Sequence, residues 1–294
     1  MSIELDRVTF IYHPGTPFAR TAVKELSMVI PQGEILGITG EVGAGKSTFL
    51  QLAGGLIRPT NGHVLLEGND LAGSKQRELA IMRRRVGLAF QHPERQLFGY
   101  QVFDELAFGP RNAGLNRQEI KERVEWALQA VGLSAACQDR TIISLSAGER
   151  RRVAIAGVLA MKPAYLLLDE PTAGLDGEGA RRLTDTLLSL VAQPGNTIVI
   201  VSHNLRLLLA VSKRIVWLKA GGVWLDLRRE EIIGHYETLH TAAKMPEILQ
   251  VMHSLNQRGW QLDPAALTPE TLGAAIAERL KRGNGEGGTN WSTM

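Results

Sequence analysis

One short segment constrains the fold of this chain more than any other: residues 40–47 read GEVGAGKS. They match the phosphate-binding loop pattern G-x-x-x-x-G-K-[ST], which requires a strand before it and a helix after it. An apolar, β-prone run at residues 35–39 precedes the loop, and a helix-compatible run begins at Thr48. In this arrangement backbone N–H groups surround one point at a helix N-terminus, where phosphate binds. The sequence therefore predicts an α/β core that binds a nucleoside triphosphate; the alternative is a chance glycine-rich turn.

Each side chain of the loop has a chemical reason to be there. Glycines permit positive φ and a close approach of backbone to ligand. Lys46 would neutralise the β- and γ-phosphates, and Ser47 would offer its hydroxyl to Mg²⁺. The predicted nucleotide-binding residues of this segment are Gly40, Gly43, Gly45, Lys46, Ser47 and Thr48.

The composition excludes several classes of protein. Of the 294 residues, 44% are hydrophobic and 21% are charged, as in ordinary globular proteins. No apolar run approaches the roughly 18 residues of a membrane span, and the N-terminus does not resemble a signal peptide. One cysteine, Cys137, rules out an intrachain disulfide. A net charge of +3 is too small to indicate nucleic-acid binding. Local basic clusters, such as residues 83–85 and 150–152, are either solvated or face a membrane surface or an acidic partner.

The order of elements predicts a core with one insertion and one extension. Apolar runs that read as strands alternate with helical signals, which favours an α/β fold. The expected strands are residues 8–11, 35–39, 64–66, 86–90, 165–168, 197–201 and 215–218. The predicted divisions are a main domain at 1–228 with a helical subdomain at about 95–161, a helical extension at 229–282 and a flexible tail at 283–294.

Candidate catalytic residues stand where predicted strands end. Asp169 and Glu170 follow one apolar strand, where Asp169 would hold Mg²⁺ and Glu170 would accept a proton from the attacking water. His203 comes after a second strand and suits sensing of a γ-phosphate. Gln91 follows a third, and its carbonyl could meet Mg²⁺ or water on a moving hinge. The plainer alternatives are acids that cap a turn and ordinary polar loop residues.

A second anion site is predicted at residues 145–149, which read LSAGE before a helix. Ser146 and Gly148 at a helix N-terminus would bind phosphate a second time. Two phosphate-binding surfaces in one chain make sense when each is half of a composite site. Two copies would then face each other head to tail.

The order and spacing of these motifs, over roughly residues 3–225, resemble those of ATP-binding-cassette (ABC) ATPases. The motifs in question are the phosphate loop, Gln91, residues 145–149, residues 166–170, residues 174–176 and His203. The resemblance implies that Ser146 and Gly148 touch the γ-phosphate held by a partner subunit, and that Asp176 links the two sites. It also implies that Tyr12 stacks on adenine, since an aromatic face suits any base; the alternative is a core tyrosine.

The family's usual signature is LSGGQ, from which this chain departs at two positions. Ala147 adds a methyl group, and Glu149 adds a negative charge that we expect to point away from the phosphates. The resemblance implies a P-loop NTPase core, formed by a RecA-like sheet plus an antiparallel β part. It further implies the inserted helical subdomain and a small C-terminal helical extension.

Finer features resemble the ATPase subunits of energy-coupling-factor (ECF) transporters, bacterial importers of vitamins and of cobalt or nickel. The matching segments are residues 12–17, 91–98, 102–112 and 151–161. The resemblance implies ATP and Mg²⁺ as cofactors and a peripheral location on the cytoplasmic face of the cell membrane. The implied partners are a second ABC ATPase, the same or a related chain, a transmembrane scaffold and a substrate-binding membrane subunit, with no nucleic acid. The extension at 229–282 would help the ATPases to pair.

A groove for the scaffold is expected after Gln91, formed with Pro93, Leu97 and Phe98. The alternative is that Leu97 and Phe98 pack inside the helical subdomain. At the level of function, the rivals are a soluble non-transport ABC ATPase and a small-molecule kinase that shares only the phosphate loop. An export ATPase would normally carry membrane spans, which the sequence lacks.

Overall fold

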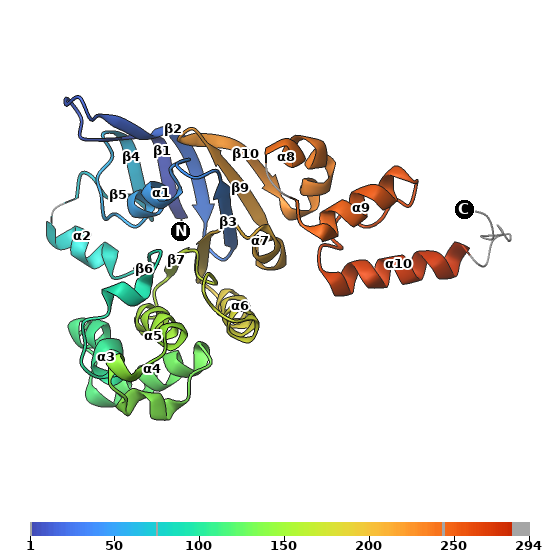
Figure 1. The fold of residues 1–294 in the computed structure, drawn as a ribbon. Coiled ribbons are helices and arrows are strands. Elements are labelled where there is room, and N and C mark those ends of the chain that lie inside the picture. Colours follow the sequence, from blue (N-terminus) through green and yellow to red (C-terminus); the bar gives the residue numbers. More distant parts are fainter. Residues whose placement is uncertain (1, 75, 243–244, 284–294) are drawn as a thin grey trace.

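The structure is a computed structural model that describes residues 2–74, 76–242 and 245–283. It contains two sheets and a set of helices in a P-loop NTPase arrangement, which confirms the predicted α/β class (Figure 1). Among the described residues, no helix is both long and apolar enough to cross a membrane. Most of the predicted tail, residues 284–294, lies outside the described residues, and Gly283 is the last residue of a helix.

The larger sheet has the strand order β10-β9-β3-β8-β7-β6. Strands β9, β3, β8, β7 and β6 run parallel to one another, while β10 pairs antiparallel with β9 at one edge. The bounds are β3 (Ile35–Gly40), β6 (Val86–Ala89), β7 (Tyr165–Asp169), β8 (Thr197–Val201), β9 (Arg214–Lys219) and β10 (Gly222–Arg228).

A smaller antiparallel sheet has the order β2-β1-β4-β5. Its strands are β1 (Ser2–Tyr12), β2 (Arg20–Pro31), β4 (Asn61–Leu66) and β5 (Asn69–Asp70). The sequence pattern did not predict strands β2, β5 and β10. In β2 buried and exposed residues mix along the strand, so it lacks the continuous apolar run that marked the strands buried on both faces.

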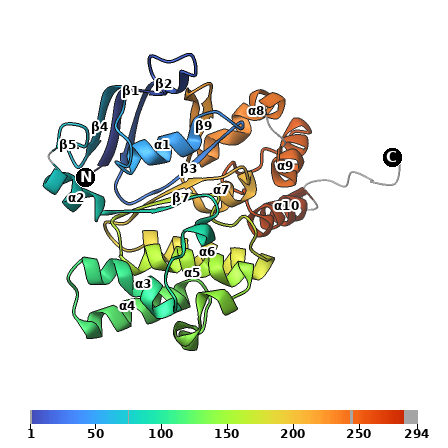
Figure 2. The same cartoon turned by 60° about the vertical axis from the view of Figure 1, so that its left-hand side comes forward.

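Helices surround the larger sheet and form a separate lobe. The bounds are α1 (Lys46–Ala53), α2 (Gln76–Arg83), α3 (Val102–Asn112), α4 (Arg117–Ala130), α5 (Ala147–Ala160), α6 (Gly177–Val191), α7 (Leu205–Val211), α8 (Tyr236–Ala242), α9 (Glu247–Gln257) and α10 (Pro269–Gly283). Helices α3, α4 and α5 lie together in the lobe below the sheets in both ribbon views (Figure 2). Helices α8, α9 and α10 project to one side (Figure 1).

Four 3-10 helices complete the elements of the described residues: η1 (Pro93–Gln96), η2 (Ala135–Asp139), η3 (Ile142–Ser144) and η4 (Arg229–His235). The predicted helical extension begins with two elements, since its first residues divide between η4 and α8. At the start of η4 the Arg228 backbone N–H donates to Glu231 Oε2 at 2.7 Å.

The core explains why the central strands are apolar throughout. Successive residues of β8 alternate between two hydrophobic clusters: Ile198 and Ile200 belong to one, and Val199 and Val201 to the other. A strand with core on both faces shows no polar alternation. The same sheet brings the carboxyl ends of β3, β7 and β8 side by side, which positions the candidate site.

Candidate nucleotide-binding site

A cavity of about 550 Å³ opens at the carboxyl ends of β3 and β7. Its lining combines the phosphate loop with residues that come from far along the chain: Tyr12, Arg20, Ala22, Val42, Gly43, Gly45, Lys46, Ser47, Thr48, Gln91, Asp169, Glu170, Ala173 and His203. Ten of the sequence-predicted residues therefore meet in one place. In open α/β sheets, ligands bind at this edge of the strands.

The loop backbone depends on its glycines. Gly45 has φ 97° and Gly40 has φ 142°, values that favour glycine. A Cβ atom at Gly45 would also collide with the carbonyl oxygen of Ala22, and one at Gly40 with that of Leu218. Loop and strands are thus packed backbone against backbone next to the N-terminus of α1, a position suited to bind phosphate.

Lys46 lies with its Nζ folded onto the loop, donating to the carbonyl oxygens of Gly40 at 2.7 Å and Glu41 at 2.8 Å. Burial lowers the pKa of the Lys46 ammonium, while Glu170 and Asp169 act in the opposite direction. A bound triphosphate would favour the charged ammonium, since opposite charges stabilise the ionised form.

Ser47 and Asp169 form a pair of oxygen ligands beside the loop. The Ser47 hydroxyl donates to Asp169 Oδ2 at 2.8 Å, and the Asp169 residue is 5% exposed. Burial raises the pKa of the Asp169 carboxyl, against the lowering effect of the Ser47 hydrogen bond. A hydroxyl and a carboxylate next to phosphate oxygens fit the preference of Mg²⁺ for hard oxygen ligands.

Glu170 is held at both carboxylate oxygens. The Ser202 hydroxyl donates to Oε2 at 2.8 Å, and the backbone N–H of His203 donates to Oε1 at 2.7 Å. Glu170 itself adopts a left-handed backbone conformation with φ 49°, which non-glycine residues seldom occupy. The end of β8 thus fixes the position of the acid that follows β7.

Two polar residues at this site were not predicted from the sequence. Ser202 is fully buried and orients Glu170; its signal was a hydroxyl at a strand end, directly before His203. Arg20 lines the cavity from the start of β2. A single cation in an unpredicted strand gave no sequence signal, because only the pairing of β2 with β1 brings it to the loop.

Tyr12, at the end of β1, is 37% exposed, so it is not a core tyrosine. Its hydroxyl lies 3.1 Å from the Thr48 hydroxyl, and its ring meets Phe10 edge to face. The ring therefore stands at the cavity rim, tied to the first turn of α1.

The second predicted anion site lies apart from this cavity. None of Ser146, Gly148 and Asp176 is among the described residues that line the cavity. Ser146 is the N-cap of α5 and is exposed, and the Asp176 side chain caps α6 by accepting from Gly179 at 2.7 Å. One chain thus presents a nucleotide cavity and, elsewhere, an exposed helix N-terminus suited to an anion.

Arg151 joins α5 to the residue that follows β7. Its side chain is buried, and Nη2 donates to the Glu170 carbonyl oxygen at 2.6 Å. Its Nη1 lies 3.9 Å from Oε2 of Glu94, in η1 directly after Gln91. Glu94 Oε2 and Arg151 Nε are both buried, and neither has a hydrogen-bond partner among the residues that the structure describes. The helix that begins at Ala147 therefore contacts both the Glu170 backbone and the segment that follows Gln91.

Comparison with known proteins places this geometry in a family. A family model described as ABC transporter matches residues 23–173. The chain is 28% identical to the dimeric cassette MJ0796 in a post-hydrolysis state bound to ADP and Pi, with a TM-score of 0.71 over 77% of this chain and 98% of that one. The chain therefore belongs to the ABC transporter ATP-binding proteins, a family that binds and hydrolyses ATP.

Closer relatives refine the assignment. The chain is 44% identical to the energy-coupling factor transporter ATP-binding protein EcfA2 of Symbiobacterium thermophilum, over 94% of this chain and 96% of the relative. It is 35% identical to the protein of the same name from Clostridium perfringens, over 97% of this chain and 100% of the relative. The structure of cbiO1 from Clostridium perfringens, part of the ABC transporter complex cbiONQ, has a TM-score of 0.70 at 33% identity, covering 85% of this chain and 98% of that one. Within the family, the chain belongs with the ECF transporter ATP-binding proteins.

Proposed function

We propose that this chain powers an ECF importer of a vitamin or a transition-metal ion, as a peripheral subunit on the cytoplasmic face of the membrane. The names of the curated relatives support this function over a soluble, non-transport ABC ATPase. The observation that carries the proposal is the division of the site: a nucleotide cavity on one part of the chain and an exposed capped turn at Ser146 on another. Such a chain needs a second ATPase, the same or a related chain, to complete each site.

The proposed roles follow the contacts. Gly40, Gly43, Gly45, Lys46, Ser47 and Thr48 hold the triphosphate, and Tyr12 stacks on adenine. Ser47, Asp169 and Gln91 hold Mg²⁺, which supplies charge neutralisation at the phosphates when bound. Glu170, fixed by Ser202, accepts a proton from the attacking water, with His203 and Gln91 beside it. Ser146, Gly148 and Asp176 complete the site of the partner subunit.

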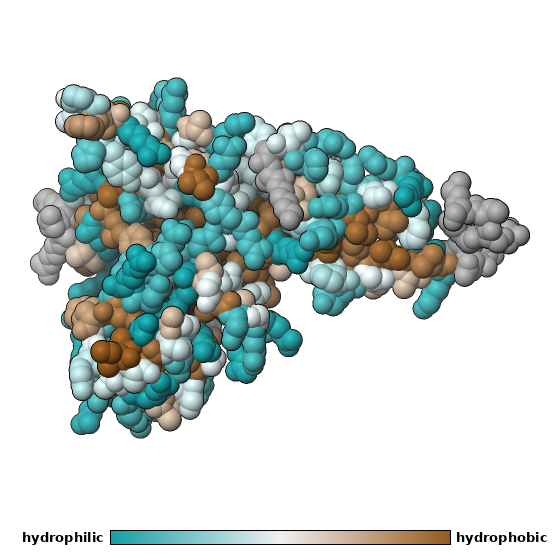
Figure 3. Space-filling model, in the orientation of Figure 1, coloured by the Kyte–Doolittle hydropathy of each residue, from teal (hydrophilic) through white to brown (hydrophobic). Residues whose placement is uncertain are grey.

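A groove beside η1 supports the proposed contact with a membrane scaffold. A cavity of about 310 Å³ lies between β6, η1, α3 and α5, and Pro93, Leu97 and Phe98 are among its lining residues. Phe98 is 67% exposed, and its ring meets Phe108 edge to face. Figure 3 shows apolar residues gathered on the surface of the same helical lobe. A protruding aromatic pair beside a cavity suits the insertion of an apolar helix face.

The C-terminal extension, residues 229–282, is the proposed dimerisation element. It is anchored to the main domain by Ile232, Leu249 and Met252, which belong to the main hydrophobic cluster, and by the Arg206–Glu247 ion pair between α7 and α9. Val251 and Leu280 remain exposed at 44% and 50%. An anchored extension with unburied apolar residues is suited to contact a second ATPase.

Capture of the tagged chain from detergent-solubilised native membranes tests the proposal. We expect a second ATPase, a membrane scaffold and a small substrate-binding membrane protein to be recovered, and the last of these identifies the cargo. Recovery with ribosomes or nucleic acid alone would instead support the soluble, non-transport alternative.

A further inference from the structure

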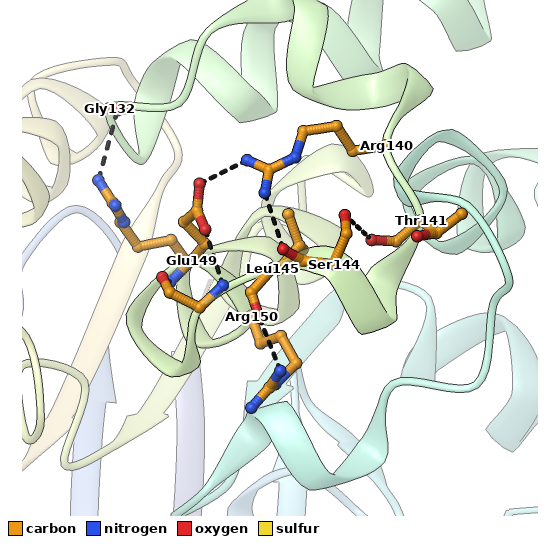
Figure 4. Close-up of polar contacts among 9 residues, drawn as sticks. Gly132, Arg140, Thr141, Ser144, Leu145, Glu149 and Arg150 are labelled. Carbon is orange, nitrogen blue, oxygen red and sulfur yellow. Dashed lines mark hydrogen bonds and ion pairs between the residues drawn. The ribbon is translucent and has the colours of Figure 1, made fainter.

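The turn that precedes α5 is held by a charged clamp centred on Glu149. Glu149 Oε2 accepts from the Ser146 backbone N–H at 2.8 Å, and the Glu149 N–H donates to the Ser146 hydroxyl at 3.2 Å. The other carboxylate oxygen, Oε1, accepts from Arg140 Nη1 at 2.6 Å. Figure 4 shows the Arg140 guanidinium reaching both Glu149 and the segment at Ser144, to whose carbonyl oxygen Nη2 donates at 2.9 Å.

Two further arginines of α5 donate to backbone carbonyl oxygens, and one of them reaches the same turn. Arg150 Nη1 donates to the Leu145 carbonyl oxygen at 2.7 Å (Figure 4). Arg152 Nη1 donates to the Gly132 carbonyl oxygen at 3.4 Å, between α4 and η2. Within the described part of the chain, Arg140 is the only one of these three cations that forms an ion pair with Glu149. Arg140 therefore fixes the segment before Ser146 and neutralises the carboxylate after it.

The carboxylate is ionised throughout the ordinary pH range. Hydrogen bonds from the Ser146 backbone and from Arg140 lower the pKa of Glu149 to about 2. At neutral pH the negative charge therefore stands one turn from the Ser146 hydroxyl. A phosphate brought to this helix N-terminus would be repelled by an uncompensated carboxylate.

We propose that Arg140 is a positioning residue for ATP hydrolysis, which makes the Glu149 carboxylate compatible with the γ-phosphate held by the partner subunit. This inference rests on the proposed function, because it takes Ser146 to meet the partner's nucleotide. Glu149 and Ser146 cap each other: the carboxylate accepts from the Ser146 N–H, and the Ser146 hydroxyl accepts from the Glu149 N–H. Arg140 neutralises the negative charge that the carboxylate brings to this turn. The pair lets a glutamate stand where the family's usual signature has a neutral glutamine.

Charge compensation makes a prediction that a purely structural clamp does not. Arg140→Met leaves Glu149 uncompensated and repels the partner's nucleotide, whereas adding Glu149→Gln removes the repelling charge and keeps a side-chain acceptor for the Ser146 N–H. The second substitution should therefore suppress the first. Because the repulsion is between partly exposed charges, salt should also weaken it.

The experiment measures kcat and KM for ATP with the full-length chain purified together with its partner ATPase, at low and high salt. The variants are R140M, E149Q and R140M/E149Q, with melting temperatures to monitor folding. Lys121→Met is the matched control, since it removes one cation of an exposed pair with Glu125 on α4, in the same subdomain.

We expect R140M to raise KM for ATP by about tenfold at low salt, with a smaller change in kcat. High salt should reduce the increase, the double variant should return to within about twofold of wild type, and K121M should match wild type. An unchanged KM in R140M, or a double variant as impaired as R140M, would overturn the inference about Arg140. As long as the wild-type protein hydrolyses ATP, these results leave the proposed function unaffected. If the wild-type chain together with its partner ATPase hydrolyses no ATP, both the inference about Arg140 and the proposed function are overturned.

Discussion

At the scale of single residues, Glu170 is the acid most tightly fixed in the cavity. Ser202 and the His203 backbone hold its two oxygens, so the side chain is placed before any nucleotide arrives. We expect Glu170→Gln to lower ATP hydrolysis by about 10²–10⁴-fold, because the amide cannot accept the proton. ATP affinity should persist, since the phosphate loop is untouched. Steady-state hydrolysis and equilibrium ATP binding check this, and unchanged turnover removes Glu170 from the base role.

A second residue-scale prediction concerns acid stability. Because the pKa of Glu149 is lowered to about 2 from its ordinary value of 4.5, its ionised form stabilises the fold. That stabilisation is fully present above pH 4.5 and is lost as the pH falls towards 2. The wild-type protein should therefore have a higher melting temperature than Glu149→Gln at neutral pH. This difference in melting temperature should shrink as the pH falls from 4.5 to 2. Thermal melts across this range measure it; a difference independent of pH contradicts the clamp.

At the scale of elements, Arg151 connects α5 to the end of β7. We expect Arg151→Gln to lower kcat by about 10–100-fold through displacement of Glu170, with little change in ATP affinity. If Arg151 acts through Glu170, the substitution should cause no further loss in a Glu170→Gln background.

The control for this cycle is Arg123→Gln. Arg123 also donates to backbone carbonyls of the helical lobe, at Ala160 and Met161, but at the far end of α5. The Arg123→Gln substitution should lower the stability of the protein, but its effect on kcat should not depend on whether residue 170 is glutamate or glutamine. Additive losses from the Arg151 and Glu170 substitutions would assign Arg151 a structural role only.

At the scale of the whole molecule, the helical lobe carries both the capped turn at Ser146 and the proposed scaffold groove. Exchange of Phe98 and Phe108 for serine should reduce recovery of the membrane scaffold several-fold, because the exposed aromatic pair is lost. ATP binding should be retained, since neither ring lines the nucleotide cavity. Quantitative co-purification checks this, and undiminished recovery would place the scaffold contact elsewhere.

Much of the candidate site could be predicted from the sequence because its signals are local. The phosphate loop, Asp169 and Glu170 each stand at the end of an apolar strand, and a parallel sheet gathers such ends at one edge. The mixed pattern of β2 hid that strand, and with it Arg20. Ser202 was passed over because only the contact between strand ends gives its hydroxyl a partner.

The sequence alone determined the fold class, the phosphate loop and the order of the motifs, since strand apolarity and loop chemistry depend on neighbours along the chain. The tertiary structure alone decided how distant residues act on one another: Arg140 on Glu149, Arg151 on the Glu170 carbonyl, and Ser202 on the Glu170 carboxylate. Hydrogen bonds and ion pairs require atoms within about 3–4 Å. No pattern along the chain brings residues from different elements to that distance; only packing of those elements does.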